Sequence, residues 1–171
     1  VDPVVTFKAN GGTGSDYTQT VNYNTSTALT ANTFTRTGYT FAGWNTKTDG
    51  TGTPYTDKQK VTLKANTILY AKWTEKTYAV TISAGNGGTV SPSGSQTIGQ
   101  VTKTTVTATA NDNYEFANWT ATGGVVVANT SSSSTTITAT AVGTLTANFR
   151  STATNSLTVV AGANIKSVTG S

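Results

Sequence analysis

His and Cys are absent from this chain, and its carboxylates, which could carry acid–base chemistry, number seven. A glycosidase needs two carboxylates facing each other across one bond, about 5 to 10 Å apart. Nothing in the sequence makes any two of these acids converge. They are Asp2, Asp16, Asp49, Asp57, Glu75, Asp112 and Glu115. We therefore expect no catalytic residue and no enzyme activity.

Metal and cofactor chemistry is equally restricted. Without His or Cys the chain has no typical zinc, haem or iron–sulfur ligands, no Ser-His-Asp triad and no thiol nucleophile. The segments 49–52 and 111–113 resemble calcium loops, but neither supplies more than one carboxylate, and calcium takes six to eight oxygen ligands. We interpret both segments as turns and expect no metal and no cofactor.

The remaining candidates are residues that could bind a partner. Tyr17, Tyr23 and Tyr55 lie near predicted loops or on the hydrophilic side of predicted strands, and exposed Tyr is a common contact residue. The alternative is ordinary cross-strand packing. The basic residues are scattered too sparsely for a nucleic-acid surface. Their nearest approach to a patch is Lys58, Lys60 and Lys64, which we interpret as solvated edge-strand lysines or, alternatively, as a site for wall polymers or glycosaminoglycans.

Composition predicts the elements that must position these side chains. Thr makes up roughly a quarter of the chain and Leu is scarce. Thr is β-branched and favours strands while keeping a hydroxyl on the solvent face. We expect a mainly β fold with little or no helix. No apolar stretch approaches the roughly 20 residues that would span a membrane, so we expect no membrane insertion.

The chain repeats itself at an offset of roughly 75 residues. Three landmarks share this offset: an opening strand with an Asn-Gly pair, a Tyr-x-Phe-x-x-Trp segment, and a closing strand. In the first copy they are Val5–Thr13, Gly38–Trp44 and Ile68–Trp73, and in the second copy Val80–Thr89, Asn113–Trp119 and Thr144–Phe149.

Each landmark has a structural interpretation. Asn-Gly tolerates positive φ, which predicts that Asn10-Gly11 and Asn86-Gly87 form tight hairpin turns. The two small residues before Trp44 and Trp119 predict a bulge that turns each ring toward the core. We expect all three Trp side chains to be largely buried beside Tyr39, Phe41, Tyr114 and Phe116. The segment Ser26–Asn32 is too short to decide between helix and strand.

The first copy resembles the Listeria–Bacteroides repeat, the B-repeat module of internalin B-type surface proteins. The resemblance rests on Phe34–Thr37, Gly38–Trp44 and Ile68–Trp73. The second copy resembles the divergent form of that repeat, which is Thr-rich and ends in Thr146–Phe149. The resemblance implies small β-grasp-like modules in secreted or wall-attached bacterial proteins. It implies no enzyme and supplies no catalytic residues.

These observations predict a first module over residues 1–75, a second over 76–151, and the truncated start of a third over 152–171. We expect a stalk or spacer that displays a functional domain of a bacterial cell-surface or secreted protein. The alternatives are an adhesin-type module that binds a host protein or wall glycan, and an accessory domain of a secreted polysaccharide-degrading enzyme. We expect a monomer, apart from edge-strand contacts of the C-terminal segment.

Overall fold

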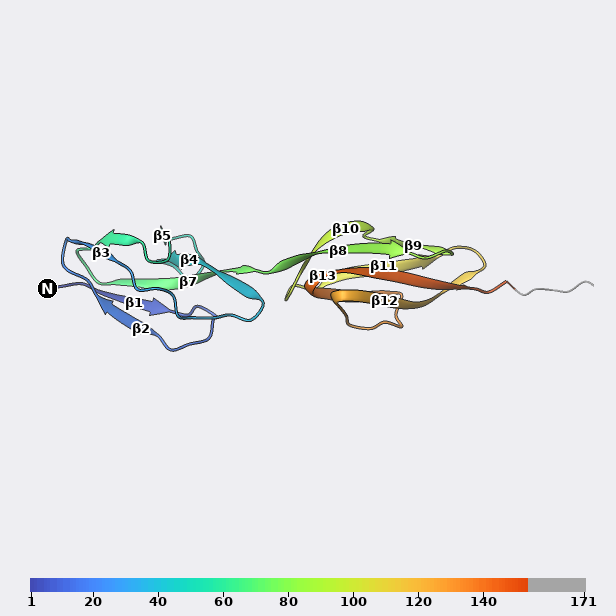
Figure 1. Ribbon diagram of the computed structural model, residues 1–171, viewed down its shortest axis with the longest axis horizontal. Coiled ribbons are helices and arrows are strands. Elements are labelled where there is room, and N and C mark those ends of the chain that lie inside the picture. The colour runs from blue at the N-terminus through green and yellow to red at the C-terminus, as the bar shows by residue number, and fades with distance from the viewer. Residues whose placement is uncertain (154–171) are drawn as a thin grey trace, which may run out of the picture.

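The computed structural model describes residues 1–153, so most of the segment predicted to begin a third module lies outside the described residues. The described part is built from strands and contains no helix, which confirms the predicted mainly β class. It accordingly offers no helix with the length and apolarity to cross a membrane. The strands form two units that follow each other along the long axis of the molecule (Figure 1). We call them the N-terminal unit and the C-terminal unit.

The N-terminal unit contains a mixed five-stranded sheet in the order β2-β1-β7-β4-β5, and a separate pair of strands, β3 and β6. Its first and last strands, β1 and β7, run parallel at the centre, which is the β-grasp order without a helix. The segment Ser26–Asn32 begins as a strand. The strands are β1 (Val4–Lys8), β2 (Tyr17–Thr20), β3 (Ser26–Ala28), β4 (Tyr39–Asn45), β5 (Pro54–Tyr55), β6 (Lys60–Thr62) and β7 (Thr67–Glu75).

The C-terminal unit repeats this plan with longer strands. Its first and last strands, β8 and β13, are again parallel neighbours. The order is β10-β8-β13-β11-β9, and β12 pairs with β13 along most of its length. The strands are β8 (Thr77–Ala84), β9 (Gly88–Ser91), β10 (Gly94–Gly99), β11 (Thr104–Ala110), β12 (Tyr114–Val127) and β13 (Ser134–Ser151).

Each unit buries its own set of apolar side chains, because alternate residues of each strand point to the same face. The two clusters share no residue. The N-terminal cluster consists of Val5, Phe7, Val21, Leu29, Phe34, Trp44, Val61, Leu69 and Ala71. The C-terminal cluster consists of Val80, Ile82, Ile98, Val106, Ala108, Trp119, Ile137, Ala139, Leu145 and Ala147.

A bulge in β4 brings two large rings to the same core, as the sequence predicted. The pairing of β4 with β7 shifts register between Phe41 and Trp44. Gly43 lies in this bulge with a φ of 111°, and a Cβ there would come within 2.7 Å of the Tyr55 carbonyl oxygen. Phe41 and Trp44 consequently meet edge to face, with ring centroids 4.9 Å apart. A second register shift separates Phe116 from Asn118 in β12.

The predicted burial of the aromatic residues is only partly correct. Trp44 and Trp119 are buried, with exposed fractions of 1% and 3%. Trp73 is half-buried, because its indole lies at the core margin and donates a hydrogen bond to the Ala9 carbonyl. The prediction was wrong for Tyr114, which is 39% exposed. Its ring lies over Gly87, where an added Cβ would strike it.

The opening strand of each unit does pair antiparallel with a returning strand, β1 with β2 and β8 with β10, but the predicted tight turns were wrong. Asn10 and Gly11 do adopt positive φ, of 46° and 84°. However, the chain then pairs Thr13 with Thr35 before it returns as β2, so a longer loop connects β1 and β2. In the C-terminal unit only Gly87 of the Asn-Gly pair has positive φ, and β9, which follows, pairs with β11 rather than β8.

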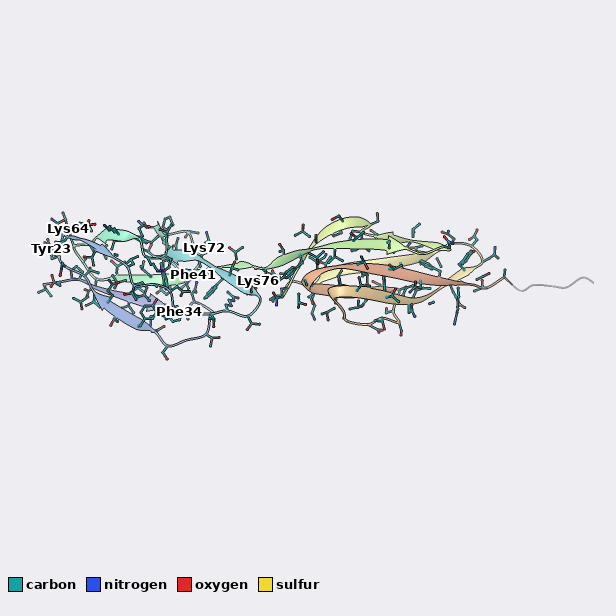
Figure 2. The ribbon with its side chains drawn as sticks, viewed as in Figure 1. Tyr23, Phe34, Phe41, Lys64, Lys72 and Lys76 are labelled. Carbon is teal, nitrogen blue, oxygen red and sulfur yellow. The ribbon has the colours of Figure 1, made fainter. Side chains whose placement is uncertain are left out.

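The connection between the units is a single residue. β7 ends at Glu75 and β8 begins at Thr77, so Lys76 alone separates them. The Lys76 N–H donates to the Gly38 carbonyl at 2.8 Å, and the Lys76 carbonyl accepts from the Gln100 N–H at 2.9 Å. Figure 2 shows Lys76 in the narrow segment between the two sheets. One residue is therefore bonded to both units.

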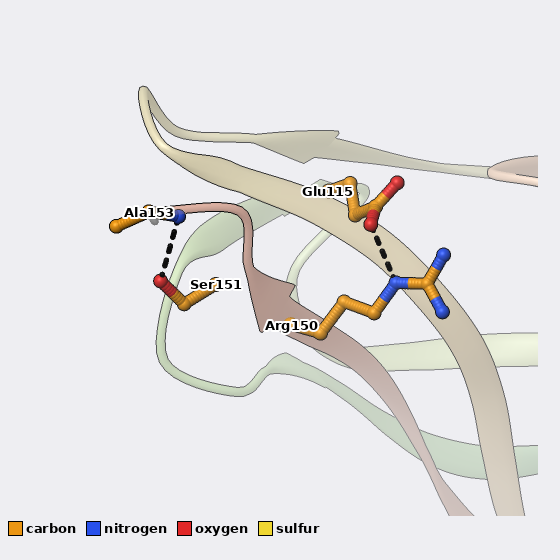
Figure 3. A network of polar contacts seen from close by, with 4 residues as sticks. All are labelled: Glu115, Arg150, Ser151 and Ala153. Atoms are coloured by element: carbon orange, nitrogen blue, oxygen red, sulfur yellow. Dashed lines mark hydrogen bonds and ion pairs between the residues drawn. The ribbon is translucent and has the colours of Figure 1, made fainter. Parts of the chain in front are cut away.

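The C-terminal end of the second unit repeats the chain path at this connection. Ser151 pairs with Tyr114 in the register that Glu75 has with Tyr39. The next residue, Thr152, donates its N–H to the Asn113 carbonyl, as Lys76 does to Gly38. Figure 3 shows the surroundings, where Arg150 pairs with Glu115 at 2.6 Å and the Ser151 hydroxyl accepts from the Ala153 N–H.

Candidate functional site

The three tyrosines proposed as contact residues lie in different surroundings. Tyr17 stacks on Phe7 with ring centroids 4.6 Å apart, and burial raises the pKa of its phenol. Tyr55 packs against the N-terminal core from β5. Tyr23 is 53% exposed at the outer end of the N-terminal unit (Figure 2). The fold therefore does not gather them into one surface.

The lysines singled out by sequence lie on the periphery of the N-terminal unit. Lys60 is in β6, Lys58 is in the turn before it, and Lys64 follows it. All three side chains are exposed. The chain beside Lys64 is bonded to the Tyr23 segment through the Asn24 N–H and the Leu63 carbonyl.

Five of the seven acids are used in contacts that hold the surrounding structure, and a sixth, Asp112, is exposed in the turn before β12. Asp2, Asp49 and Asp57 accept hydrogen bonds from nearby backbone N–H groups. Asp16 and Glu115 each form a surface ion pair at 2.6 Å, with Lys8 and Arg150. Within residues 1–153 no three acids approach closely enough to hold a metal ion together.

Glu75 is the remaining acid, and it joins the two units. One carboxylate oxygen accepts the backbone N–H groups of Val101 and Thr102 at 2.7 and 2.6 Å. The other accepts the Thr102 hydroxyl at 2.6 Å. Hydrogen bonding lowers the pKa of this carboxyl below its ordinary value, with the bond from the Thr102 hydroxyl contributing most.

A polar hollow of about 230 Å³ opens on the N-terminal unit. Its wall comes from the turn after β1, the loop between β4 and β5, and the end of β7. Three cations line it, together with one carboxylate and the half-buried Trp73. The lining residues are Asn10, Arg36, Asn45, Lys47, Thr48, Asp49, Gly50, Ala71, Lys72 and Trp73.

The loop that carries Lys47 and Asp49 is held by a buried amide. Asn45 is 2% exposed, and its Nδ2 donates to the carbonyls of Gly50 and Gly52 at 3.0 and 3.2 Å. Its Oδ1 accepts the N–H groups of Lys47 and Gly52, both at 2.9 Å. Four hydrogen bonds from one side chain therefore fix the backbone of this loop.

The guanidinium of Arg36 is held in place without using its hydrogen-bond donors. It lies 4.0 Å from the centroid of the Tyr39 ring and packs against Gly11. Among residues 1–153 the side chains of Arg36, Lys47 and Lys72 make no ion pair and no hydrogen bond. Asp49 faces the same hollow, but Thr51 occupies its carboxylate through a backbone N–H at 2.9 Å and a hydroxyl at 2.8 Å.

A second, shallower hollow of about 190 Å³ lies beside Tyr55, and Trp44 contributes to its lining. The indole Nε1 of Trp44 is buried and has no hydrogen-bond partner among the described residues. Trp119, its counterpart in the C-terminal unit, donates to the Ser132 carbonyl at 2.8 Å. The indole N–H of this Trp therefore has a protein acceptor in the C-terminal unit and none among the described residues of the N-terminal unit.

Sequence reasoning missed Arg36, Lys47 and Lys72 as a group. They come from three separate segments, and only the pairing of β4 with β7 brings these segments together. The Asn-Gly pair at Asn10 was a usable signal, because its turn aims the Asn10 side chain at the carbonyls of Thr48 and Ala71. The sequence interpretation of Asn10-Gly11 as a hairpin turn assigns no contact to the Asn10 side chain.

The fold defines the class of protein: a tandem pair of small β-grasp-like modules. Residues 4–72 match the family model described as the Listeria-Bacteroides repeat domain, and residues 78–153 match the Divergent InlB B-repeat domain. The chain belongs to these repeat families, as its sequence resemblance indicated. Repeat domains of these families are generally non-catalytic modules. The searches of curated proteins and of solved structures each returned no match.

Proposed function

We propose that this chain is a non-enzymatic spacer segment of a protein exported to the outside of a bacterial cell. In this proposal residues 1–75 and 76–151 are the two modules. Their family supports the location, because such repeats occur in bacterial surface proteins. The spacer role rests on the connection between the units.

The observation that carries the spacer role is the bonding at Glu75 and Lys76. A spacer must hold its two ends apart, and a flexible linker would let the units fold back on each other. Here the linker is one residue, and its N–H and carbonyl are bonded to opposite units. The Glu75 carboxylate adds three hydrogen bonds to Val101 and Thr102. These bonds support a fixed, extended arrangement.

Close packing at the same place also supports a fixed joint. Gly38 is buried with a φ of 80°, and a Cβ there would lie 2.5 Å from Cγ2 of Val101. The backbone of the N-terminal unit therefore touches a side chain of the C-terminal unit directly. Reorientation would have to break this contact together with the hydrogen bonds.

The experiment compares tumbling and shape in solution. Backbone 15N relaxation of the parent chain should give both units one common, elongated diffusion tensor, and small-angle X-ray scattering should give an extended particle. Glu75→Gln should uncouple the units, because an amide is a weaker acceptor than a carboxylate. Glu115→Gln is the control, since it removes the same charge away from the joint.

Independent tumbling of the two units in the parent chain would contradict the spacer proposal. If the two units tumbled together equally in the parent chain and in Glu75→Gln, the Glu75 carboxylate would have no role in holding the joint.

A second candidate function, binding of a ligand by the N-terminal unit, is favoured by the polar hollow that Arg36, Lys47 and Lys72 line. Its geometry carries a specific inference.

A further inference from the structure

We infer that the polar hollow of the N-terminal unit binds an acidic sugar unit of a polysaccharide. Because a spacer needs no ligand, this goes beyond the proposed function. The site is the cleft lined by Arg36, Lys47 and Lys72, with Asn10 and Trp73 in its wall. We call it the cationic hollow.

The charge of the hollow selects an anionic group. Arg36, Lys47 and Lys72 make no ion pair with any residue from 1 to 153, so their charges are available to a ligand. The one acid in the lining, Asp49, accepts two hydrogen bonds from Thr51, and these bonds, followed by the nearby charge of Lys47, hold its pKa below the ordinary value. Charge-assisted hydrogen bonds to carboxylate, sulfate or phosphate are about twice as strong as neutral ones.

The hollow is organised before any ligand arrives. Tyr39 supports the Arg36 guanidinium from below, and Gly11 confines it from the side. Asn45 fixes the loop that carries Lys47. A preformed site loses less conformational entropy on binding than a mobile one.

The neutral part of the lining favours a sugar over an acidic peptide. Nδ2 of Asn10 donates to the Thr48 and Ala71 carbonyls, which leaves Oδ1 as an acceptor. Both bonds from Thr51 go to Oδ1 of Asp49, so Oδ2 of this carboxylate is a second acceptor beside the cations. Acceptors next to cations suit a ligand that carries hydroxyl donors beside one anionic group. A volume of about 230 Å³ is below the range of drug-sized pockets and suits one such unit.

The C-terminal unit lacks this arrangement and provides an internal comparison. Asn148 stands in β13 where Lys72 stands in β7, and it donates to Asn118 and Thr120. Asn111 stands at the position of Arg36, three residues before the landmark Tyr. We therefore place the site in the N-terminal unit alone.

The test is an NMR titration of the 15N-labelled chain at low salt. The acidic probes are oligogalacturonate, a sulfated oligosaccharide and a polyol-phosphate oligomer, which separate the possible sources of the anionic group. A neutral cello-oligosaccharide and hexaglutamate are the comparison ligands. We expect at least one acidic carbohydrate probe to shift the amides of residues 47–50 and 71–73, with the C-terminal unit unaffected.

Variants then locate the binding. Lys47→Gln combined with Lys72→Gln changes two exposed side chains, so the fold should be retained, and we expect affinity to fall about tenfold or more. Lys58→Gln combined with Lys60→Gln removes the same charge outside the hollow and should leave the affinity within about twofold.

Three outcomes would overturn the inference. The first is the absence of shifts with every acidic carbohydrate probe. The second is equal binding of the neutral oligosaccharide, or stronger binding of hexaglutamate. The third is an equal loss of affinity in both lysine pairs, which would indicate attraction by net charge alone.

Discussion

At the scale of single residues, Asn45 has the largest structural role of any polar side chain in the N-terminal unit. It is buried, and both ends of its amide are bonded to the loop between β4 and β5. Leaving buried polar groups without partners costs about 1 to 3 kcal/mol each. The residue thus couples the core of the sheet to the rim of the cationic hollow.

We predict that Asn45→Ala lowers the free energy of unfolding of the N-terminal unit by about 3 kcal/mol. Urea denaturation followed by amide NMR signals of that unit measures the change. Asn22→Ala is the control, because Asn22 is exposed and should change stability by less than about 0.5 kcal/mol. A loss below about 1 kcal/mol for Asn45→Ala would show that the loop holds itself without the amide.

At the scale of elements, the bulge in β4 decides which side chains reach the core. Strict alternation along β4 would place Phe41 and Trp44 on opposite faces. The register shift at Gly43 places both against the same cluster. This backbone lies at a φ of 111°, a conformation that only glycine adopts readily.

We predict that Gly43→Ala lowers the free energy of unfolding of the N-terminal unit by about 2 to 3 kcal/mol. The added Cβ meets both the unfavourable φ and the Tyr55 carbonyl oxygen. Gly94→Ala separates these causes, because Gly94 has a φ of 77° and no atom within 4 Å of the added Cβ. That control should lose only about 1 kcal/mol in thermal or urea unfolding of its own unit. If both variants lost the same free energy of unfolding, the contact between the added Cβ and the Tyr55 carbonyl oxygen would make no contribution of its own.

The elements that sequence predicted are those whose signal is local. The closing strands and the bulges before Trp44 and Trp119 follow from alternation and small residues within a few positions. The sequence also alternates over Thr135–Thr140, which predicts a strand separate from the closing strand Thr144–Phe149, but the structure joins the two segments in one strand, β13. β13 remains continuous because Gly123 and Gly124, which have no side chains, let β12 approach its backbone closely at the register shift between the two strands. This pairing joins segments that are distant in sequence, so the local pattern does not predict it.

The candidate site was less predictable than the fold. Tyr17 was selected for its type, yet its ring is stacked on Phe7 in the core margin. The cations of the hollow were visible in the sequence but lay in three unrelated segments. The positions of charged residues follow no periodic pattern, so they do not indicate which segments meet. The alternation of apolar residues does indicate which faces pack together. Only the pairing of strands supplies that information.

At the scale of the whole molecule, the joint at Glu75 should respond to pH. The folded-state pKa of this carboxyl is lowered, so its contribution to the joint is fully present above the ordinary value of 4.5. The contribution is lost as the pH falls through the lowered folded-state value, because a protonated carboxyl is a poorer acceptor for Val101 and Thr102.

We predict that the common tumbling of the two units persists from pH 7 to about 5 and weakens progressively in more acidic solution. Measuring 15N relaxation as a function of pH checks this. Glu115→Gln should follow the parent, while Glu75→Gln should show weak coupling at every pH. A parent chain whose coupling is unchanged down to pH values where both units still fold would exclude titration of Glu75 as the cause.

Ser151, at the end of β13, can be compared with Glu75 at the joint between the two units. Ser151 occupies the register of Glu75, and the backbone bond that follows it is preserved, but its short hydroxyl accepts from Ala153 within its own segment. Under the spacer proposal, path and stiffness therefore depend on different groups: the backbone bond at Lys76 or Thr152 sets the direction in which the chain leaves a unit, and the Glu75 carboxylate adds to the contacts that hold the next unit. We expect that single-residue substitutions at the position of Glu75 change the stiffness of a joint in such an array without changing the folds it connects.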